Sequence, residues 1–458
     1  MGFFSNAVAL ARFQFALTVA FHFLFVPMSI GLGLIMALTS RRYYKTRDPQ
    51  DLAHLKLFVK IFAATFIVGV ATGVTMEFAF GTNWANYSRY VGDIFGAPLA
   101  AEALFAFFLE SVFLGVLIFG RKRVSPKFYN LSAWLVWAGS CLSALWIIIA
   151  NSWMQTPAGY KVVGEGLAQR AHITDFVAAA VNHSTFQRYF HVVVALLAMG
   201  AFLAMAISAY YYLKENHLDF AKKTMRISVT IAVIASILML PLGHWQAVGV
   251  ANNQPEKLAA LEGHWDTGQM DMALVGWINE DTGHTYSINV PIKGFIGLLT
   301  HMDTKQSFKG LNDIPKAERA PLQATFQTYH LMVLMWGVMI VLALAAFIME
   351  RKDLIRKKKW AQKVLMWAPL APLAAIQCGW MAAEIGRQPW IVWGLLKTAD
   401  GASATVAVPP SQILITILLF IVVYAVIAVI YLRVVLGLIK KGPQLEPADA
   451  PALEEEAN

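Results

Sequence analysis

The sequence predicts an all-α fold: a polytopic membrane protein built as a bundle of nine transmembrane helices. Of its 458 residues, 58% are hydrophobic and only 14% are charged, whereas a soluble chain has about one-quarter charged residues. The mean hydropathy is +0.55. Apolar runs long enough to cross about 30 Å of hydrocarbon occur near residues 14–38, 56–79, 96–119, 129–151, 187–213, 224–248, 325–349, 364–385 and 411–438.

Each run has flanks that fit a membrane helix. The first is too long for a signal peptide, contains His22 and lacks a small-residue cleavage site, so we expect it to remain as a helix. The second to sixth runs follow one another through polar connections. The seventh begins after a long polar stretch, and the eighth ends at Gly386 and Pro389, residue types that stop helices. The ninth leads into a short tail.

The basic residues predict the orientation of the bundle. Of the 37 Lys and Arg residues, 23 lie in four short connections and at the end of the ninth run. These segments alternate with longer, less basic connections. Cytoplasmic loops carry the excess of Lys and Arg, so we expect a periplasmic N-terminus and a cytoplasmic C-terminus. The net charge of +9 is then a topology signal, and we expect membrane lipid and no nucleic acid as a partner.

Four parts follow from this pattern. Residues 1–248 hold helices one to six, and residues 325–441 hold helices seven to nine. Residues 249–324 form a long periplasmic loop with a helical patch from Glu256 to Trp265, and a loop of this length is usually functional or disordered. The acidic, proline-containing segment 442–458 is predicted to be a disordered cytoplasmic tail.

Two histidines and a methionine lie well inside the runs: His22 in AFHFLF, His191 in YFHVVV and Met332 in YHLMVLM. A histidine there either hydrogen-bonds a neighbouring helix or binds a metal or haem, and a methionine is usually a filler of core gaps. His/Met is a recognised ligand pair of low-spin haem, which favours haem. His330 points to the other side of its helix, where it meets a haem propionate or reaches the interface.

Two carboxylates share the third run. Glu102 and Glu110 are eight residues apart, which means about 80° of rotation and ~12 Å of rise. We interpret Glu102 as part of a metal site and Glu110 as a step on a proton path from the cytoplasm. The alternative is a pair of protonated carboxyls that join helices.

The eighth run ends in GWMAAEIGRQPW. Trp380 and Glu384 are spaced i, i+4 and therefore share one face. Arg387 lies about one turn further and can reach Glu384 or an anionic group of a ligand. A plain ion pair at the helix end is the alternative.

These buried groups share a predicted depth. His22, Glu102, His191, Met332 and Glu384 each lie within about seven residues of the outer end of their run, roughly 10 Å. One layer of His, Met and Glu favours metal ligation shared between helices. The eleven histidines are otherwise scattered, which argues against a haem–copper site. Walker and glycine-loop motifs are absent, and the two cysteines predict no disulfide or thiolate site.

Four segments carry a resemblance to a known family: TMEFAFGTNW (75–84), VGDIFGAPLAAEALFAFFLES (91–111), LSALWIIIANSWMQTP (142–157) and GRQPW (386–390). They resemble subunit I of the cytochrome bd-type quinol oxidases, and the match covers all nine runs. The loop 249–324 is short for the family and is similar to the branch that includes cyanide-insensitive oxidases.

The resemblance implies two haem b and one haem d, and whether haem b replaces haem d stays open. His191 and Met332 match the ligands of low-spin haem b. His22 and Glu384 match ligands of the two high-spin haems, in an order that stays open, and Glu102 is a further candidate ligand beside them.

The other implied roles concern electrons, protons and quinol. Trp380 matches an aromatic residue between haems, and Arg387 and His330 match positions near propionates. Glu110 and Ser143 match a cytoplasmic proton route. Lys257 and Glu262 match residues implicated in quinol oxidation, although their spacing puts them about 140° apart on a helix.

The function implied is that of a quinol:O2 oxidoreductase in the bacterial cytoplasmic (inner) membrane. It would oxidise quinol on the periplasmic side and reduce O2 to water with cytoplasmic protons, generating a proton motive force without pumping. The implied partners are a multi-span subunit II and a small single-helix subunit. The competing hypothesis is a proton-coupled secondary transporter, which also explains buried carboxylates but not His22, His191 and Met332 at one depth.

Overall fold

The computed structural model describes residues 3–404 and 407–445. Within these residues, nine helical segments are long and apolar enough to cross a membrane: Ala7–Thr46, Pro49–Thr82, Ala85–Phe119, Pro126–Gln155, Phe176–Lys214, Leu218–Asn253, Leu322–Arg351, Lys359–Ile385 and Pro410–Lys441. The predicted all-α class and the nine spans are therefore confirmed. Of the predicted tail, residues 446–458 lie outside the described part.

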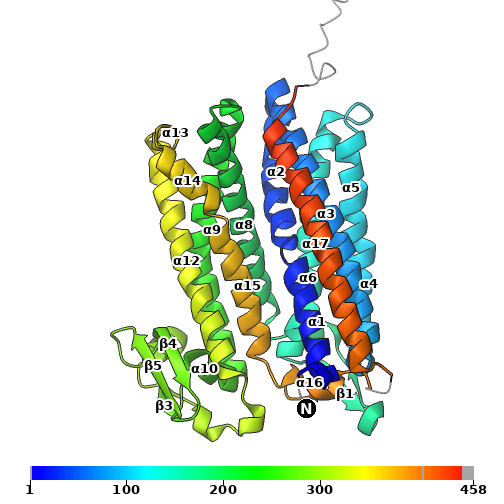
Figure 1. Ribbon diagram of the computed structural model, residues 1–458, viewed down its shortest axis with the longest axis vertical. Helices are drawn as coiled ribbons and strands as arrows, with labels where there is room; N and C mark the ends of the chain where they lie inside the picture. The colour runs from blue at the N-terminus through cyan, green and yellow to red at the C-terminus, as the bar shows by residue number, and fades with distance from the viewer. Residues whose placement is uncertain (1–2, 405–406, 446–458) are drawn as a thin grey trace, which may run out of the picture.

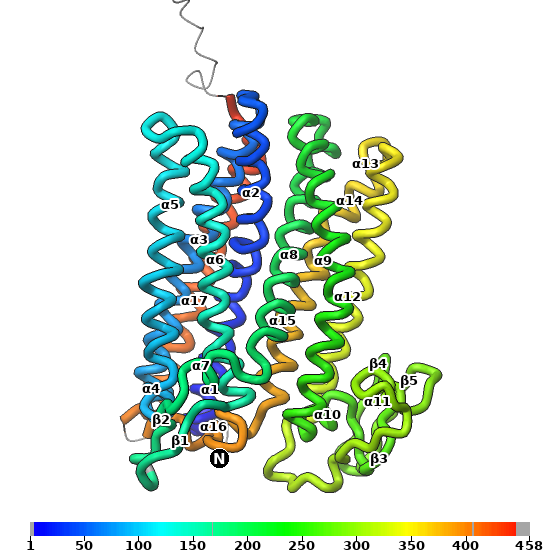
Figure 2. Tube along the Cα trace, turned by 180° about the vertical axis from the view of Figure 1, so that it is seen from behind, coloured from blue at the N-terminus to red at the C-terminus, as the bar shows by residue number. Residues whose placement is uncertain are grey.

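The nine spans stand side by side as two groups (Figures 1 and 2). One group consists of α1 (Ala7–His22), α2 (Val26–Thr46), α3 (Pro49–Thr82), α4 (Ala85–Ala101), α5 (Phe108–Phe119), α6 (Pro126–Gln155) and α17 (Pro410–Lys441). The other consists of α8 (Thr185–Lys214), α9 (Leu218–Asn253), α12 (Leu322–Arg351), α14 (Lys359–Trp367) and α15 (Leu370–Ile385). We call the end of the bundle where α1 begins the N-side, and the end where α17 stops the C-side.

The two groups meet where α2 packs against α8. Gly31 and Gly200 face each other there, and a Cβ added to Gly200 would lie 2.1 Å from the carbonyl carbon of Gly31. Only two glycines allow the backbones to come this close. The contact brings the side chains of the two groups within reach of each other.

Three of the predicted runs contain an interruption of the helix, which their apolar pattern did not predict. The first breaks after His22 and resumes at Val26. The third contains a π-helical stretch, Glu102–Phe107, that follows Pro98 in α4; such bulges are frequent at functional sites. The eighth breaks at Pro369, which lacks the N–H that a continuous helix needs.

The described parts of the N-side connections contain short helices, and also short strands that sequence analysis did not predict (Figure 1). The 249–324 connection contains α10 (Pro255–Glu262), β3 (Gly268–Gln269), β4 (Ala273–Asn279), β5 (His284–Asn289), α11 (Phe295–His301) and β6 (Ser307–Phe308). Elsewhere are β1 (Tyr160–Val163), β2 (Arg170–Ile173), α7 (Phe176–Ala180), β7 (Trp390–Val392), β8 (Leu396–Lys397) and α16 (Thr398–Gly401), with α13 (Leu354–Lys357) on the C-side. The predicted helical patch is confirmed from Glu256 to Glu262, where α10 ends, and residues 263–265 are not helical.

A buried carboxylate ties three helices together on the C-side. Asp51, 1% exposed, accepts hydrogen bonds from Lys223 Nζ at 2.9 Å and Thr46 Oγ1 at 2.8 Å. Arg42 Nε lies 3.4 Å from Asp51 Oδ2, the same oxygen that accepts from Thr46. The pairs join α2, α3 and α9.

We expect Asp51→Ala to lower the free energy of unfolding by about 2 kcal/mol, because it removes the buried end of charge-assisted hydrogen bonds to the partly exposed Lys223 and Arg42. Lys223 keeps its pair with Asp219 at 2.8 Å, which limits the loss. Thermal unfolding of the detergent-purified protein would measure it. Asp353→Ala is the control, since Asp353 and Lys357 form an exposed pair at 3.9 Å and should change the same quantity by less than about 1 kcal/mol. Equal effects would contradict the assigned role.

Candidate functional site

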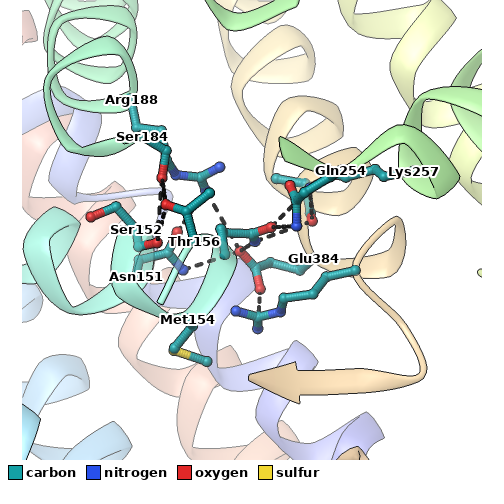
Figure 3. A network of polar contacts seen from close by, with 12 residues as sticks. Asn151, Ser152, Met154, Thr156, Ser184, Arg188, Gln254, Lys257 and Glu384 are labelled. Atoms are coloured by element: carbon teal, nitrogen blue, oxygen red, sulfur yellow. Dashed lines mark hydrogen bonds and ion pairs between the residues drawn. The ribbon is translucent and has the colours of Figure 1, made fainter. Parts of the chain in front are cut away.

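A buried polar network surrounds Glu384 where α15 ends on the N-side (Figure 3). Arg387 Nη2 lies 2.5 Å from Glu384 Oε2, so the ion pair that the sequence analysis named as a possibility is present. Asn151 and Gln155 of α6 donate to Glu384 Oε1 at 3.1 and 3.3 Å. Arg188 of α8 approaches the same oxygen at 3.9 Å.

Lys257 enters this network from α10. Its Nζ donates to the carbonyl of Ala383 at 2.8 Å and to Gln155 Oε1 at 3.1 Å. The side chain is buried, and burial, followed by the nearby Arg188 charge, holds the pKa of Lys257 well below its usual value. Lys257 therefore belongs to the same site as Glu384.

The network holds more cationic groups than anionic ones. Arg188 and Arg387 are both buried, and Glu384 is the carboxylate they share. Within the described residues, Arg188 Nε and Arg387 Nε and Nη1 have no hydrogen-bond acceptor. Buried donors are rarely left unpaired, so the arrangement suits an additional anionic group.

His191 and Met332 face the interior of the second group of helices. His191 Nδ1 is buried and has no hydrogen-bond partner among the described residues. Met332 Sδ lies against Gly379 of α15, where an added Cβ would come within 2.9 Å of the sulfur. An imidazole and a thioether are a donor set that fits a low-spin haem.

His22 ends α1 and faces α3. Its Nδ1 lies 2.8 Å from Thr72 Oγ1, and an added Cβ on Gly73 would be 3.4 Å from the ring. Trp380 of α15 meets the edge of Phe23 with ring centroids 5.2 Å apart. Trp380 therefore lies beside the end of α1, between the two groups of helices.

The carboxylates of the third span each contact a serine of α6. Ser143 donates to Glu102 Oε1 at 2.8 Å, and Ser140 donates to Glu110 Oε1. The two serines are three residues apart and so lie on one face of α6 with about 4.5 Å of rise between them. Gly139 leaves room for Glu110, because an added Cβ would lie 2.7 Å from its Cγ.

Glu262 is directed away from Lys257. Glu262 Oε2 accepts from the Ala273 N–H at 3.2 Å and lies 3.9 Å from His330 Nε2. Both ring nitrogens of His330 face backbone carbonyls, of Phe326 at 2.8 Å and Ala273 at 3.0 Å. The ring of His330 therefore faces the 249–324 loop, and backbone carbonyls occupy both of its nitrogens. Lys257 and Glu262 do not share a contact.

The buried His, Met and Glu side chains do not all lie at the one depth that the sequence analysis expected. Glu384 contacts Asn151 and Glu102 contacts Ser143, and these two partners are about 12 Å apart along α6. Glu102 lies midway along Ala85–Phe119, not near its N-side end. The groups are staggered across the N-side half of the bundle.

Sequence reasoning missed several residues of the site. Arg188 was not singled out, although it lies at the start of the fifth run and precedes His191 by three residues. Ser140 and Asn151 lie inside the fourth apolar run, and Gln155 lies just beyond its end. Polar residues in or beside an apolar run are a signal that was available. Within the described residues, no group of three or more His, Cys, Asp or Glu side chains is placed to hold a metal ion. Donors in ones and twos suit iron held mainly by a porphyrin.

Fold and site together define a multi-pass membrane protein with buried His, Met and Glu donors. The model of the cytochrome bd terminal oxidase subunit I family matches residues 10–443. The chain belongs to this family, which is a family of bacterial respiratory membrane proteins. Membership excludes the competing transporter hypothesis.

Two relatives and one solved structure show the extent of the similarity. The cytochrome bd ubiquinol oxidase subunit 1 of Bacillus subtilis (strain 168) is 36% identical, over 96% of this chain and 95% of that protein. The cytochrome bd-II ubiquinol oxidase subunit 1 of Escherichia coli (strain K12) is 32% identical, over 98% and 99%. The bd oxidase from Geobacillus thermodenitrificans superposes with a TM-score of 0.88 at 27% identity, covering 96% of this chain and 99% of the other.

Proposed function

We propose that this chain is the haem-bearing subunit of a quinol:O2 oxidoreductase with its N-side in the periplasm. Family membership supports the reaction class. The 23 basic residues of the short connections and of the end of the ninth run lie toward the C-side, which supports a cytoplasmic C-side under the positive-inside rule. Residues 249–324 then form the periplasmic quinol-binding loop.

His191 and Met332 would hold a low-spin haem b. His22 and Glu384 would hold the two high-spin haems, one haem b and one haem d or haem b, with Glu102 beside them and Trp380 between the helix groups. When bound, the haems supply one-electron transfer and the reduction of dioxygen. Both Glu384 oxygens accept from N–H groups here, and binding iron would replace one of these contacts.

Arg188 and Arg387 would hold haem propionates. The observation that carries the proposal is their three buried N–H groups without acceptors. Arginine binds carboxylates through its planar fork of donors, and a propionate would complete the hydrogen bonding of each buried guanidinium.

Lys257 and Glu262 would act at separate points of quinol oxidation. Lys257 touches the Glu384 network and can orient an oxygen of the quinol. Glu262 ends α10 and can accept a proton and pass it to the periplasm. Charge separation follows without a pump if Glu110, Ser140, Ser143 and Glu102 deliver protons from the C-side.

The oxidase would assemble with a second, multi-span subunit. The subunit-numbered relatives support such a partner. A small single-helix subunit is a further expected component.

The reduced-minus-oxidised optical spectrum of the purified oxidase tests the proposal. We expect b-type bands, with an additional red band if haem d is present. A folded, colourless protein that fails to consume O2 with quinol would refute it.

We expect quinol oxidation to fall about tenfold per pH unit below pH 8. Burial raises the pKa of Glu262 to about 8, so the base form needed to accept a proton is lost as pH decreases. The sign is opposite for stability: the folded chain binds this proton more tightly than the unfolded chain, so stability decreases as pH rises from about 4.5 to 8. Steady-state rates from pH 6 to 9 would measure the effect.

Glu262→Gln should lower the rate and abolish this pH limb. Glu256→Gln is the control. Glu256 lies on α10 like Glu262, but it is partly exposed and pairs with Lys309 at 3.0 Å. A limb that persists in Glu262→Gln would assign the pH dependence to another group.

A further inference from the structure

A groove separate from the haem and quinol residues opens between α12 and the α14–α15 pair on the C-side. It is a shallow, open groove of about 630 Å³. Its lining includes Val338 and Leu342 of α12, Val364 and Trp367 of α14, and Ala371 and Ala374 of α15. The break at Pro369 separates α14 from α15. Together with the small alanines, this break leaves the space unfilled.

The mouth of the groove is basic. Lys363 belongs to its lining, and Lys359 lies one turn earlier on the same face of α14. Both are exposed, and neither takes part in an ion pair with any described residue. The preceding α13 adds Arg356 and Lys357, and Lys358 follows it. The mouth therefore attracts anions.

The position of α14 fits the membrane–water boundary. Trp360 and Trp367 are 61% and 70% exposed, and exposed tryptophans gather at this boundary. From Lys363 to Ala374 is eleven residues, roughly 16 Å. This length matches one leaflet of a hydrocarbon layer about 30 Å thick. A groove of this length is too short for a helix that spans the membrane.

We propose that this groove binds an anionic phospholipid of the C-side leaflet. One acyl chain lies along Val338, Ala371 and Ala374, and the phosphate pairs with Lys363 and Lys359. Met335 also lines the groove, three residues from Met332. The lipid thus packs against the helix that carries a candidate haem ligand, although its binding does not depend on the proposed function.

Native mass spectrometry of the delipidated oxidase complex tests this site. We expect one phosphatidylglycerol to remain bound under conditions that remove phosphatidylcholine. Lys359→Glu/Lys363→Glu should weaken phosphatidylglycerol binding at least about 25-fold, since each basic residue near an anionic lipid contributes about fivefold. Lys440→Glu/Lys441→Glu, at the end of α17, makes the same charge change away from the groove and should leave binding unchanged.

Ala374→Phe fills the groove without changing its charge. We expect it to lose the tightly bound phosphatidylglycerol while the haem spectrum and the size of the complex stay the same. The proposal is overturned if phosphatidylcholine binds equally, if the lysine variants and the α17 control behave alike, or if electron microscopy of the complex finds a protein helix in the groove.

Discussion

His191→Ala should remove the low-spin haem b signal and reduce quinol oxidation by more than about 100-fold. Changes to residues that only support a metal ligand typically cost about 10–100-fold, and loss of the ligand itself should cost more. The buried Nδ1 of His191 has no partner among the described residues, which leaves this nitrogen able to bind iron. Carbon monoxide binding to the reduced protein should persist, because His22 and Glu384 lie on other helices.

Two further variants isolate the sulfur side of this site. Met332→Leu keeps the volume but removes the sulfur ligand, and it should convert the low-spin signal to high-spin. Gly379→Ala adds a Cβ within 2.9 Å of Met332 Sδ, so it should displace the sulfur and shift the same signal without changing either ligand.

Met339→Leu is the matched control. Met339 is buried on the same helix, α12, and belongs to the apolar core. Exchange of Met for Leu in a core is usually tolerated, and the spectrum should be unchanged. Simultaneous loss of all haem signals in Met332→Leu, with a normal spectrum in Met339→Leu, would contradict a dedicated low-spin site.

The spans were predictable because hydrocarbon imposes a single rule. Every backbone polar group in a membrane must be paired internally, so an apolar run of about 20 residues is a helix. The predicted runs 129–151 and 411–438 thus lie inside the observed helices Pro126–Gln155 and Pro410–Lys441. The strands of the 249–324 loop were not predictable this way. Outside the membrane, water can hydrogen-bond the backbone, so tertiary contacts decide which segments become strands.

The sequence identified several residues of the site by their type, but it could not show which of them are in contact. The cost of burial singled out His22, His191 and Glu384 from the sequence. Arg188 was missed because it begins a span, and only the fold brings it within 3.9 Å of Glu384. The depth of Glu102 was misjudged because the true span begins at Ala85, eleven residues before the apolar run.

Glu110→Gln should slow O2 consumption about 100-fold while leaving the haem content unchanged. A positioned proton carrier contributes about 10²–10⁴-fold. The glutamine amide oxygen can still accept from Ser140, so the packing of α5 against α6 is preserved and only the transferable proton is lost. Anaerobic reduction of the haems by quinol should proceed at the normal rate, which separates proton supply from electron supply.

The serine of this pair allows a finer test. Ser140→Ala removes the hydrogen bond to Glu110 and should slow turnover less than Glu110→Gln does, since the carboxyl remains. Ser132→Ala is its control, because Ser132 lies on the same helix but donates only to the carbonyl of Phe128, at 2.8 Å. If Glu110→Gln consumed O2 normally, protons would have to reach Glu102 and Ser143 without Glu110. If instead its anaerobic haem reduction were also slow, Glu110 would act on electron transfer and not on proton delivery.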